Sequence, residues 1–185
     1  IKEKQFKNAQ QFLNKGKQQG VSLDKLNNLE TRLTKEIKAN LNRVSPSQKQ
    51  LNDLLECYRN GQYVDAEKLA ITLTKEFPKH EFGWKVLGVL LGQAGRLYDA
   101  LNANKKAAEL EPQNHEVHNN LGVTLQKLGK LEDAEVSYRK AISLKNDYAE
   151  AHNNLGFPLK ELGRLEEAED SLRKAIGFRP DYFEA

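Results

Sequence analysis

A 34-residue period runs through most of this 185-residue sequence. Four sets of residues recur at that interval. They are Pro78, Pro112 and Pro180, with Asn146 in the vacant place; Leu87-Gly88, Leu121-Gly122 and Leu155-Gly156; Gly61, Gly95, Gly129 and Gly163; and Ala66, Ala100, Ala134 and Ala168. A period of roughly 20 to 50 residues is typical of arrays in which one supersecondary unit stacks on copies of itself. We therefore divide the chain into units 47–80, 81–114, 115–148 and 149–182, and we number repeat positions from the first residue of each.

Each unit is expected to form two helices. In the third unit, Leu121, Leu125 and Leu128 recur at three- and four-residue steps and make one helical face. Gly129 should end this helix, because glycine adopts the left-handed conformation at little cost. A second apolar face follows, made by Leu131, Ala134, Tyr138, Ala141, Ile142 and Leu144. Small residues such as Gly122 predict a close approach of the two helices, although the first unit has Leu54 at the glycine position.

The period, together with Trp84-x-x-Leu87-Gly88-x-x-Leu91, Ala100 and Pro112, resembles the tetratricopeptide repeat (TPR) family. The resemblance covers residues 47–182. The last two units are similar to bacterial arrays that are fused to transferases and oxygenases, and to the superhelix of O-GlcNAc transferase. The resemblance implies an all-α fold, a right-handed α-solenoid over residues 46–182 whose first helices line a concave groove.

The resemblance also implies a function. We expect a non-enzymatic scaffold that binds an extended peptide or a partner protein in its concave groove. The alternative is a substrate-recruiting arm of a larger enzyme of the glycosyltransferase, sulfotransferase or oxygenase type.

Residues 1–45 do not fit the repeat and are expected to form a basic helical extension. They contain 10 Lys/Arg and 4 Asp/Glu, a net charge of +6, within a chain of +3. One helix is expected around Phe6, Ala9, Phe12 and Leu13, and a second, capped by Ser22 or Asp24, along Leu26, Leu29, Leu33, Ile37 and Leu41. The second helix could cap the first unit or could bind a partner. Nucleic acid is not favoured as that partner, because the lysines alternate with Gln and Asn and no arginine cluster is present.

At the other end, residues 183–185 resemble the start of a fifth, truncated unit. Repeat arrays need a polar cap on their last apolar face. We therefore expect Leu172, Ala175, Ile176 and Phe178 to form an exposed apolar end. This end would mediate self-association or be covered by further repeats.

The sequence indicates no catalytic site, cofactor or metal. His118 and His152 occupy the repeat position of Trp84, so a packing role is expected. His115 and His118 lie three residues apart, but no cysteine accompanies them as a metal ligand. The single cysteine, Cys57, excludes an internal disulfide and favours a reducing, cytoplasmic location, although a secreted protein without disulfides would look the same. No apolar run approaches the roughly 20 residues that span a bilayer.

The family resemblance places repeat positions 2, 5, 6, 9, 12 and 13 in the groove. The candidate peptide-binding residues are Asn52, Tyr58, Lys85, Asn119, Asn120, Val123, Lys127, Asn153, Asn154 and Phe157. Asparagine recurs at position 6, and its amide can pair with both the N–H and the C=O of an extended peptide. Alternatively, asparagine is only a soluble filler in repeats of shared ancestry.

A second family resemblance bears on which ligand the groove binds. TPR domains that hold chaperone C-termini clamp the terminal carboxylate with lysine, asparagine and arginine. Here Lys85 and Asn120 match two members of that clamp, but Glu150 replaces a cation, so a terminal carboxylate is not expected as the ligand.

Pro158 removes one helix hydrogen bond and is expected to bend the groove wall at Phe157.

Overall fold

The computed structural model describes residues 15, 26–28, 31–32 and 45–180, and the structural account is confined to them. The chain divides into two compact units, residues 1–47 and 48–185. The first helix expected around Phe6 lies outside the described residues, as does most of the second helix. The start of a fifth unit at 183–185 lies outside them too.

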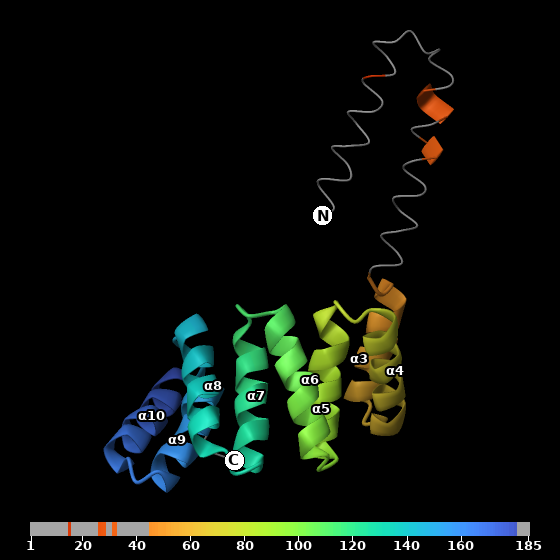
Figure 1. Ribbon diagram of the computed structural model, residues 1–185. Coiled ribbons are helices and arrows are strands. Elements are labelled where there is room, and N and C mark those ends of the chain that lie inside the picture. The colour runs from red at the N-terminus through yellow and green to blue at the C-terminus, as the bar shows by residue number, and fades with distance from the viewer. Residues whose placement is uncertain (1–14, 16–25, 29–30, 33–44, 181–185) are drawn as a thin grey trace. The chain divides into compact units, whose positions relative to one another are not determined.

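Residues 48–178 form eight helices, two in each 34-residue unit. They are α3 (Gln48–Arg59), α4 (Tyr63–Glu76), α5 (Glu81–Gln93), α6 (Leu97–Leu110), α7 (His115–Lys127), α8 (Leu131–Leu144), α9 (Ala149–Glu161) and α10 (Leu165–Phe178). Consecutive helices pack against each other along the array (Figure 1). Among the first helices of the units, α7 also contacts both α5 and α9. The expected all-α solenoid is confirmed.

Each pair of helices is joined at a glycine in the left-handed conformation. The four glycines, at φ of 73°, 74°, 74° and 75°, are Gly61, Gly95, Gly129 and Gly163. An L side chain is strained at such φ values, which explains why glycine recurs at this repeat position. The helix end expected at Gly129 is confirmed.

The two helices of a unit interlock through a glycine that faces a larger side chain. A Cβ atom on Gly88 would lie 2.0 Å from Asn104 Oδ1, and one on Gly122 would lie 2.6 Å from Tyr138 Cε1. A Cβ atom on Gly156 would lie 2.9 Å from the side chain of Leu172. Glycine therefore holds repeat position 8 because a bulkier residue at position 24 fills the space.

The first unit uses the same interlock with the sizes exchanged. Leu54 stands at position 8 and Ala70 at position 24, and both are fully buried in one core cluster. This exchange explains how Leu54 is accommodated where the other three units have glycine.

A ring N–H ties the first helix of a unit to the loop before it. Trp84 Nε1 donates to the carbonyl of Pro78 at 3.1 Å. His118 Nε2 bonds the carbonyl of Pro112, and His152 Nε2 that of Asn146, each at 3.0 Å. Because a carbonyl only accepts, both histidines must carry their proton on Nε2. The two histidines thus replace tryptophan as both packing groups and donors.

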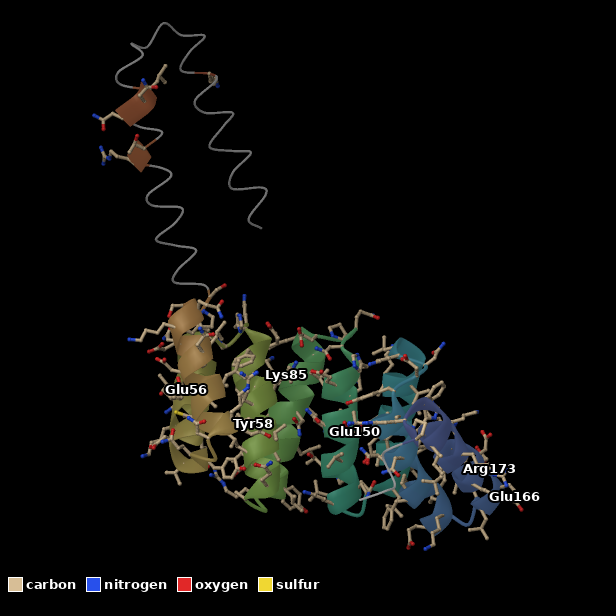
Figure 2. All side chains as sticks on the ribbon, turned by 180° about the vertical axis from the view of Figure 1, so that it is seen from behind. Glu56, Tyr58, Lys85, Glu150, Glu166 and Arg173 are labelled. Carbon is tan, nitrogen blue, oxygen red and sulfur yellow. The ribbon has the colours of Figure 1, made fainter. Side chains whose placement is uncertain are left out.

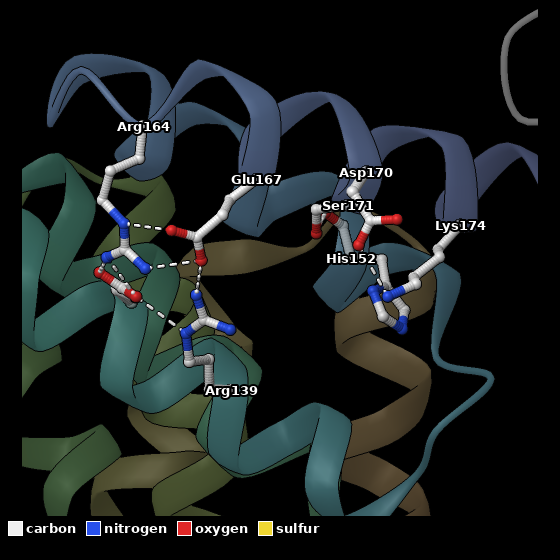
Figure 3. A network of polar contacts seen from close by, with 8 residues as sticks. Arg139, His152, Arg164, Glu167, Asp170, Ser171 and Lys174 are labelled. Atoms are coloured by element: carbon white, nitrogen blue, oxygen red, sulfur yellow. Dashed lines mark hydrogen bonds and ion pairs between the residues drawn. The ribbon is translucent and has the colours of Figure 1, made fainter.

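The second helices α8 and α10 are joined by a cluster of two arginines and two carboxylates (Figure 3). Arg164 Nη1 lies 2.7 Å from both carboxylate oxygens of Glu135, and Arg164 also binds Glu167 through two 2.7 Å contacts. Arg139 binds Glu135 and Glu167, each at 2.8 Å. Burial by itself raises the pKa of Glu135, but hydrogen bonds from Arg139 and Arg164 outweigh it and lower that pKa.

The last helix exposes an apolar face, as expected, but with one correction. Leu172, Ile176 and Phe178 are 36%, 46% and 49% exposed. Ala175 was expected on this face and is instead fully buried, because it points toward α9 within its own unit. Tyr138, at the position of Leu172 in the preceding unit, is fully buried.

Alanine substitutions at two glycines test the interlock. Gly122→Ala should lower the free energy of unfolding by about 1–2 kcal/mol, because overpacking against Tyr138 outweighs the gain in helix propensity. Gly92→Ala is the matched control, since its Cβ would meet only Ala100 Cβ at 3.9 Å, and this substitution should stabilise the protein slightly. Urea denaturation measures both, and stabilisation by both would contradict the interlock.

A Glu135→Gln variant tests the arginine cluster through its pH dependence. The pKa of Glu135 is lowered in the folded protein, so the carboxylate stabilises the fold above its ordinary pKa of 4.5, and this contribution is lost as the pH falls through the folded value. The variant should be less stable than the parent at pH 7, and the difference should shrink below about pH 4.5. Glu132→Gln is the matched control, because it removes the same charge from an exposed residue of the same helix and leaves the arginine cluster intact. A constant difference for Glu135→Gln across this range would contradict the account.

Candidate functional site

A pocket of about 210 Å³ lies where the first helices α5, α7 and α9 meet. We call it the groove pocket. Its lining residues are Gly88, Val89, Gly92, Gln93, Asn104, Asn120, Val123, Thr124, Lys127 and Glu150. Figure 2 shows Tyr58, Lys85 and Glu150 in this order along the array from α3 toward α10. The pocket thus lies on a surface that several units share.

Three of the residues predicted from the sequence come together in the groove pocket, namely Asn120, Val123 and Lys127. Of these, only Asn120 has a side-chain amide. In the described part of the chain its backbone carbonyl accepts from Asn104 and Thr124, but its side chain makes no hydrogen bond. The amide can therefore bind a ligand without first breaking a bond within the protein.

The other predicted asparagines differ in what their amides already bind. Asn119 is fully buried; its Nδ2 donates to Glu150 Oε1 at 2.9 Å and its Oδ1 accepts from Asn154 Nδ2 at 3.1 Å. Asn119 therefore supports its neighbours and presents no amide to a ligand. Asn52 Oδ1 accepts from Gln48 at 2.9 Å, whereas the half-buried Asn153 makes no side-chain hydrogen bond among the described residues.

The predicted aromatic residues lie on either side of the groove pocket and do not line it. The ring of Tyr58 on α3 packs edge-on against Tyr63, with centroids 6.1 Å apart. Phe157 on α9 is 48% exposed. Helix α9 continues through the buried Pro158 to Glu161, so this proline does not end the helix.

The sequence reasoning missed Asn104, which comes from the second helix α6. This residue is 2% exposed, and its Nδ2 donates to Thr124 Oγ1 at 2.9 Å and to the carbonyl of Asn120 at 3.4 Å. It therefore fixes α6 to α7 directly beneath the pocket. The available signal was its repeat position, which holds Tyr138 and Leu172 in the following units.

In the next unit, the repeat position of Asn104 holds the fully buried Tyr138. Its hydroxyl donates to Gln126 Oε1 at 2.9 Å. Burial, and secondarily the negative charge of Glu150, raise the pKa of Tyr138. The phenol therefore stays protonated and acts as a neutral donor at any ordinary pH.

The charged residues of the groove are only partly paired with one another. Lys85 Nζ lies 3.0 Å from Glu116 Oε2 and 4.0 Å from Glu111. Lys127 Nζ donates to the carbonyl of Gly92 at 3.4 Å and forms no ion pair within the described residues. Glu150 accepts from Asn119 Nδ2 and, at 3.3 Å, from the hydroxyl of Tyr148. The groove pocket therefore offers one ammonium and one carboxylate, each without an oppositely charged partner in the described chain.

The two histidines that lie three residues apart, His115 and His118, both have structural contacts. The His115 ring packs edge-on against Tyr148, with centroids 4.7 Å apart, and His118 bonds its loop carbonyl. Within the described ranges no group of three or more His, Cys, Asp or Glu side chains is placed to hold a metal ion. Nor does any described helix have the length and apolar character needed to cross a membrane.

Comparisons with known proteins agree with this geometry. Family models described as "TPR repeat" and "Tetratricopeptide repeat" match residues 125–162, and residues 103–136 and 149–182, respectively. A comparison of the sequence with curated proteins gives no significant match.

Similar solved structures include MamA from AMB-1, with 26% identity, 69% of this chain and 70% of that chain covered, and a TM-score of 0.61. Another MamA crystal structure has 20% identity, covers 94% of this chain and 97% of that chain, and gives a TM-score of 0.67. The first TPR of Spaghetti (RPAP3), bound to an HSP90 peptide, has 24% identity, covers 56% and 82%, and gives a TM-score of 0.55. The three family matches show that residues 103–182 of this chain are tetratricopeptide repeats, and the solved structures share the fold of the array.

Proposed function

We propose that this protein is a non-enzymatic interaction scaffold that binds an extended peptide segment of a partner protein across the groove pocket. The observation that carries the proposal is the side-chain amide of Asn120, which lines the pocket and makes no hydrogen bond within the described chain. An extended peptide has an N–H and a C=O at each residue, and one asparagine amide can satisfy both.

The surroundings of Asn120 suit this role. Val89 and Val123 give the pocket apolar contact area, and Gly88 and Gly92 line it on the α5 side. Asn153 offers a second uncommitted amide on the neighbouring helix α9. Stacked repeats create extended concave surfaces of this kind, which fit a peptide better than a compact small molecule.

Two further observations support the proposal. A domain of the same fold, the first TPR of Spaghetti (RPAP3), has been solved with a peptide bound. In this chain the charged groove side chain Lys85 is already paired with Glu116, which suits binding more than chemistry.

The proposal predicts different outcomes for two asparagines at the same repeat position. Asn120→Ala should weaken peptide binding about tenfold, the effect of losing one or two hydrogen bonds, and should leave the melting temperature nearly unchanged. Asn154→Ala should lower the melting temperature, because it removes the donor to the buried Asn119. Asn102→Ala, at an exposed residue of α6, should change neither quantity.

The probe is a soluble library of random decapeptides, acetylated and amidated at the ends, from which binders are selected on the full chain and then measured by fluorescence anisotropy. Equal binding by the parent and by Asn120→Ala would contradict the groove proposal. A library that yields no binder would contradict peptide binding altogether.

A further inference from the structure

Two equivalent bonds cross between neighbouring units on the groove side. Lys85 at repeat position 5 donates to Glu116 at position 2 of the next unit, at 3.0 Å. One unit further on, Asn119 at position 5 donates to Glu150 at position 2, at 2.9 Å. The two bonds join residues with the same sequence separation of 31. They are therefore the same contact, made once by a cation and once by a neutral amide.

This difference changes the charge of the groove. The carboxylate of Glu116 is neutralised by Lys85, whose Nζ also approaches Glu111. The carboxylate of Glu150 receives hydrogen bonds from the amide of Asn119 and the hydroxyl of Tyr148, and neither group carries a positive charge. In the described chain no lysine, arginine or histidine forms an ion pair with Glu150.

The negative charge of Glu150 also lies in a confined place. Glu150 is half-buried and lines the groove pocket. Its charge is felt by Tyr138, whose pKa is raised first by burial and then by Glu150. A charge that is partly removed from water gains more from an opposite charge than an exposed one does.

Lys127 is the other charged residue of the groove pocket, and it does not supply the missing cation. Its ammonium donates to the carbonyl of Gly92 on α5, on the opposite side of the pocket from α9. It therefore leaves the carboxylate of Glu150 available to a ligand.

We propose that Glu150 binds a cationic side chain of the peptide, a lysine or an arginine, which supplies the positive charge that Lys85 supplies to Glu116 and that the neutral Asn119 does not supply to Glu150. This inference rests on the proposed peptide binding and specifies it further, because it assigns one basic residue of the ligand to one carboxylate of the groove. The neutral donor Asn119 orients that carboxylate without cancelling its charge.

The experiment uses the full chain and the capped decapeptide library, in which only side chains carry charge. The parent protein should select peptides with lysine or arginine at one position. Glu150→Gln, which keeps the shape and removes the charge, should lose this preference and bind the selected peptide about tenfold more weakly. Glu166→Gln removes the same charge from an exposed site on α10 and should keep the preference (Figure 2).

Two further variants exchange the equivalent contacts. Lys85→Asn should free Glu116 in the way that Glu150 is free, and should add a second basic position to the selected peptides. Asn119→Lys should supply Glu150 with a cation of its own and abolish the preference. If Asn119→Lys fails to fold, as judged by circular dichroism, the Glu150→Gln and Lys85→Asn variants decide the matter.

The outcomes separate the two proposals. Peptides selected without a basic preference, or a preference that survives Glu150→Gln, would overturn the assignment to Glu150 and leave peptide binding intact. A library from which the parent protein selects no peptide would overturn both. A preference lost only in Glu150→Gln and Asn119→Lys would establish the assignment.

Discussion

The contact between repeat positions 8 and 24 is the constraint on which the rest of this solenoid depends. In three units a glycine on the first helix receives a larger side chain from the second, and in the first unit Leu54 and Ala70 exchange sizes. In every unit one of the two positions is small and the other is larger, as expected where the side chains of two closely packed helices must share one space. This contact limits how closely the two helices of a pair approach, and the pairs repeat every 34 residues along the chain.

The repetition places equivalent residues against equivalent neighbours in the next unit. Position 5 reaches position 2 of the following unit at Lys85–Glu116 and again at Asn119–Glu150. At position 24, Tyr138 is buried in the core of the third unit. Asn104, at the same position of the second unit, lines the groove pocket and donates to Thr124. Function in such an array arises from a few substitutions at equivalent positions, because the scaffold itself is repeated. The charge of Glu150 is one consequence, since an asparagine stands where the preceding unit has a lysine.

The sequence alone was enough to predict the period, the helix pairs and the glycine turns, because each of these depends on residues close together in the chain. It was also enough to predict the exposed apolar side chains of Leu172 and Ile176. Ala175 was misplaced because it adjoins the exposed Ile176 in the sequence but lies on the side of α10 that packs against α9.

The candidate site was less accessible to sequence reasoning. Asn119 and Asn120 are adjacent and chemically identical, yet one is buried in a network with Glu150 and Asn154 while the other is uncommitted. Only the neighbouring unit distinguishes them, because it supplies the partners of Asn119. Asn104 was missed for a related reason, since its partners lie on the next helix pair. The proposed binding of a basic side chain by Glu150 depends on the difference between two equivalent contacts, Lys85–Glu116 and Asn119–Glu150, which only the structure reveals.

The most direct test of the account is the nuclear magnetic resonance spectrum of the asparagine side-chain amides as a selected peptide is added to the full chain. The account predicts that the NH₂ resonances of Asn120 shift, while the guanidinium resonances of Arg139 and Arg164 stay in place. Unchanged Asn120 resonances together with shifts at Arg139 and Arg164 would place the peptide on the second helices and contradict the account.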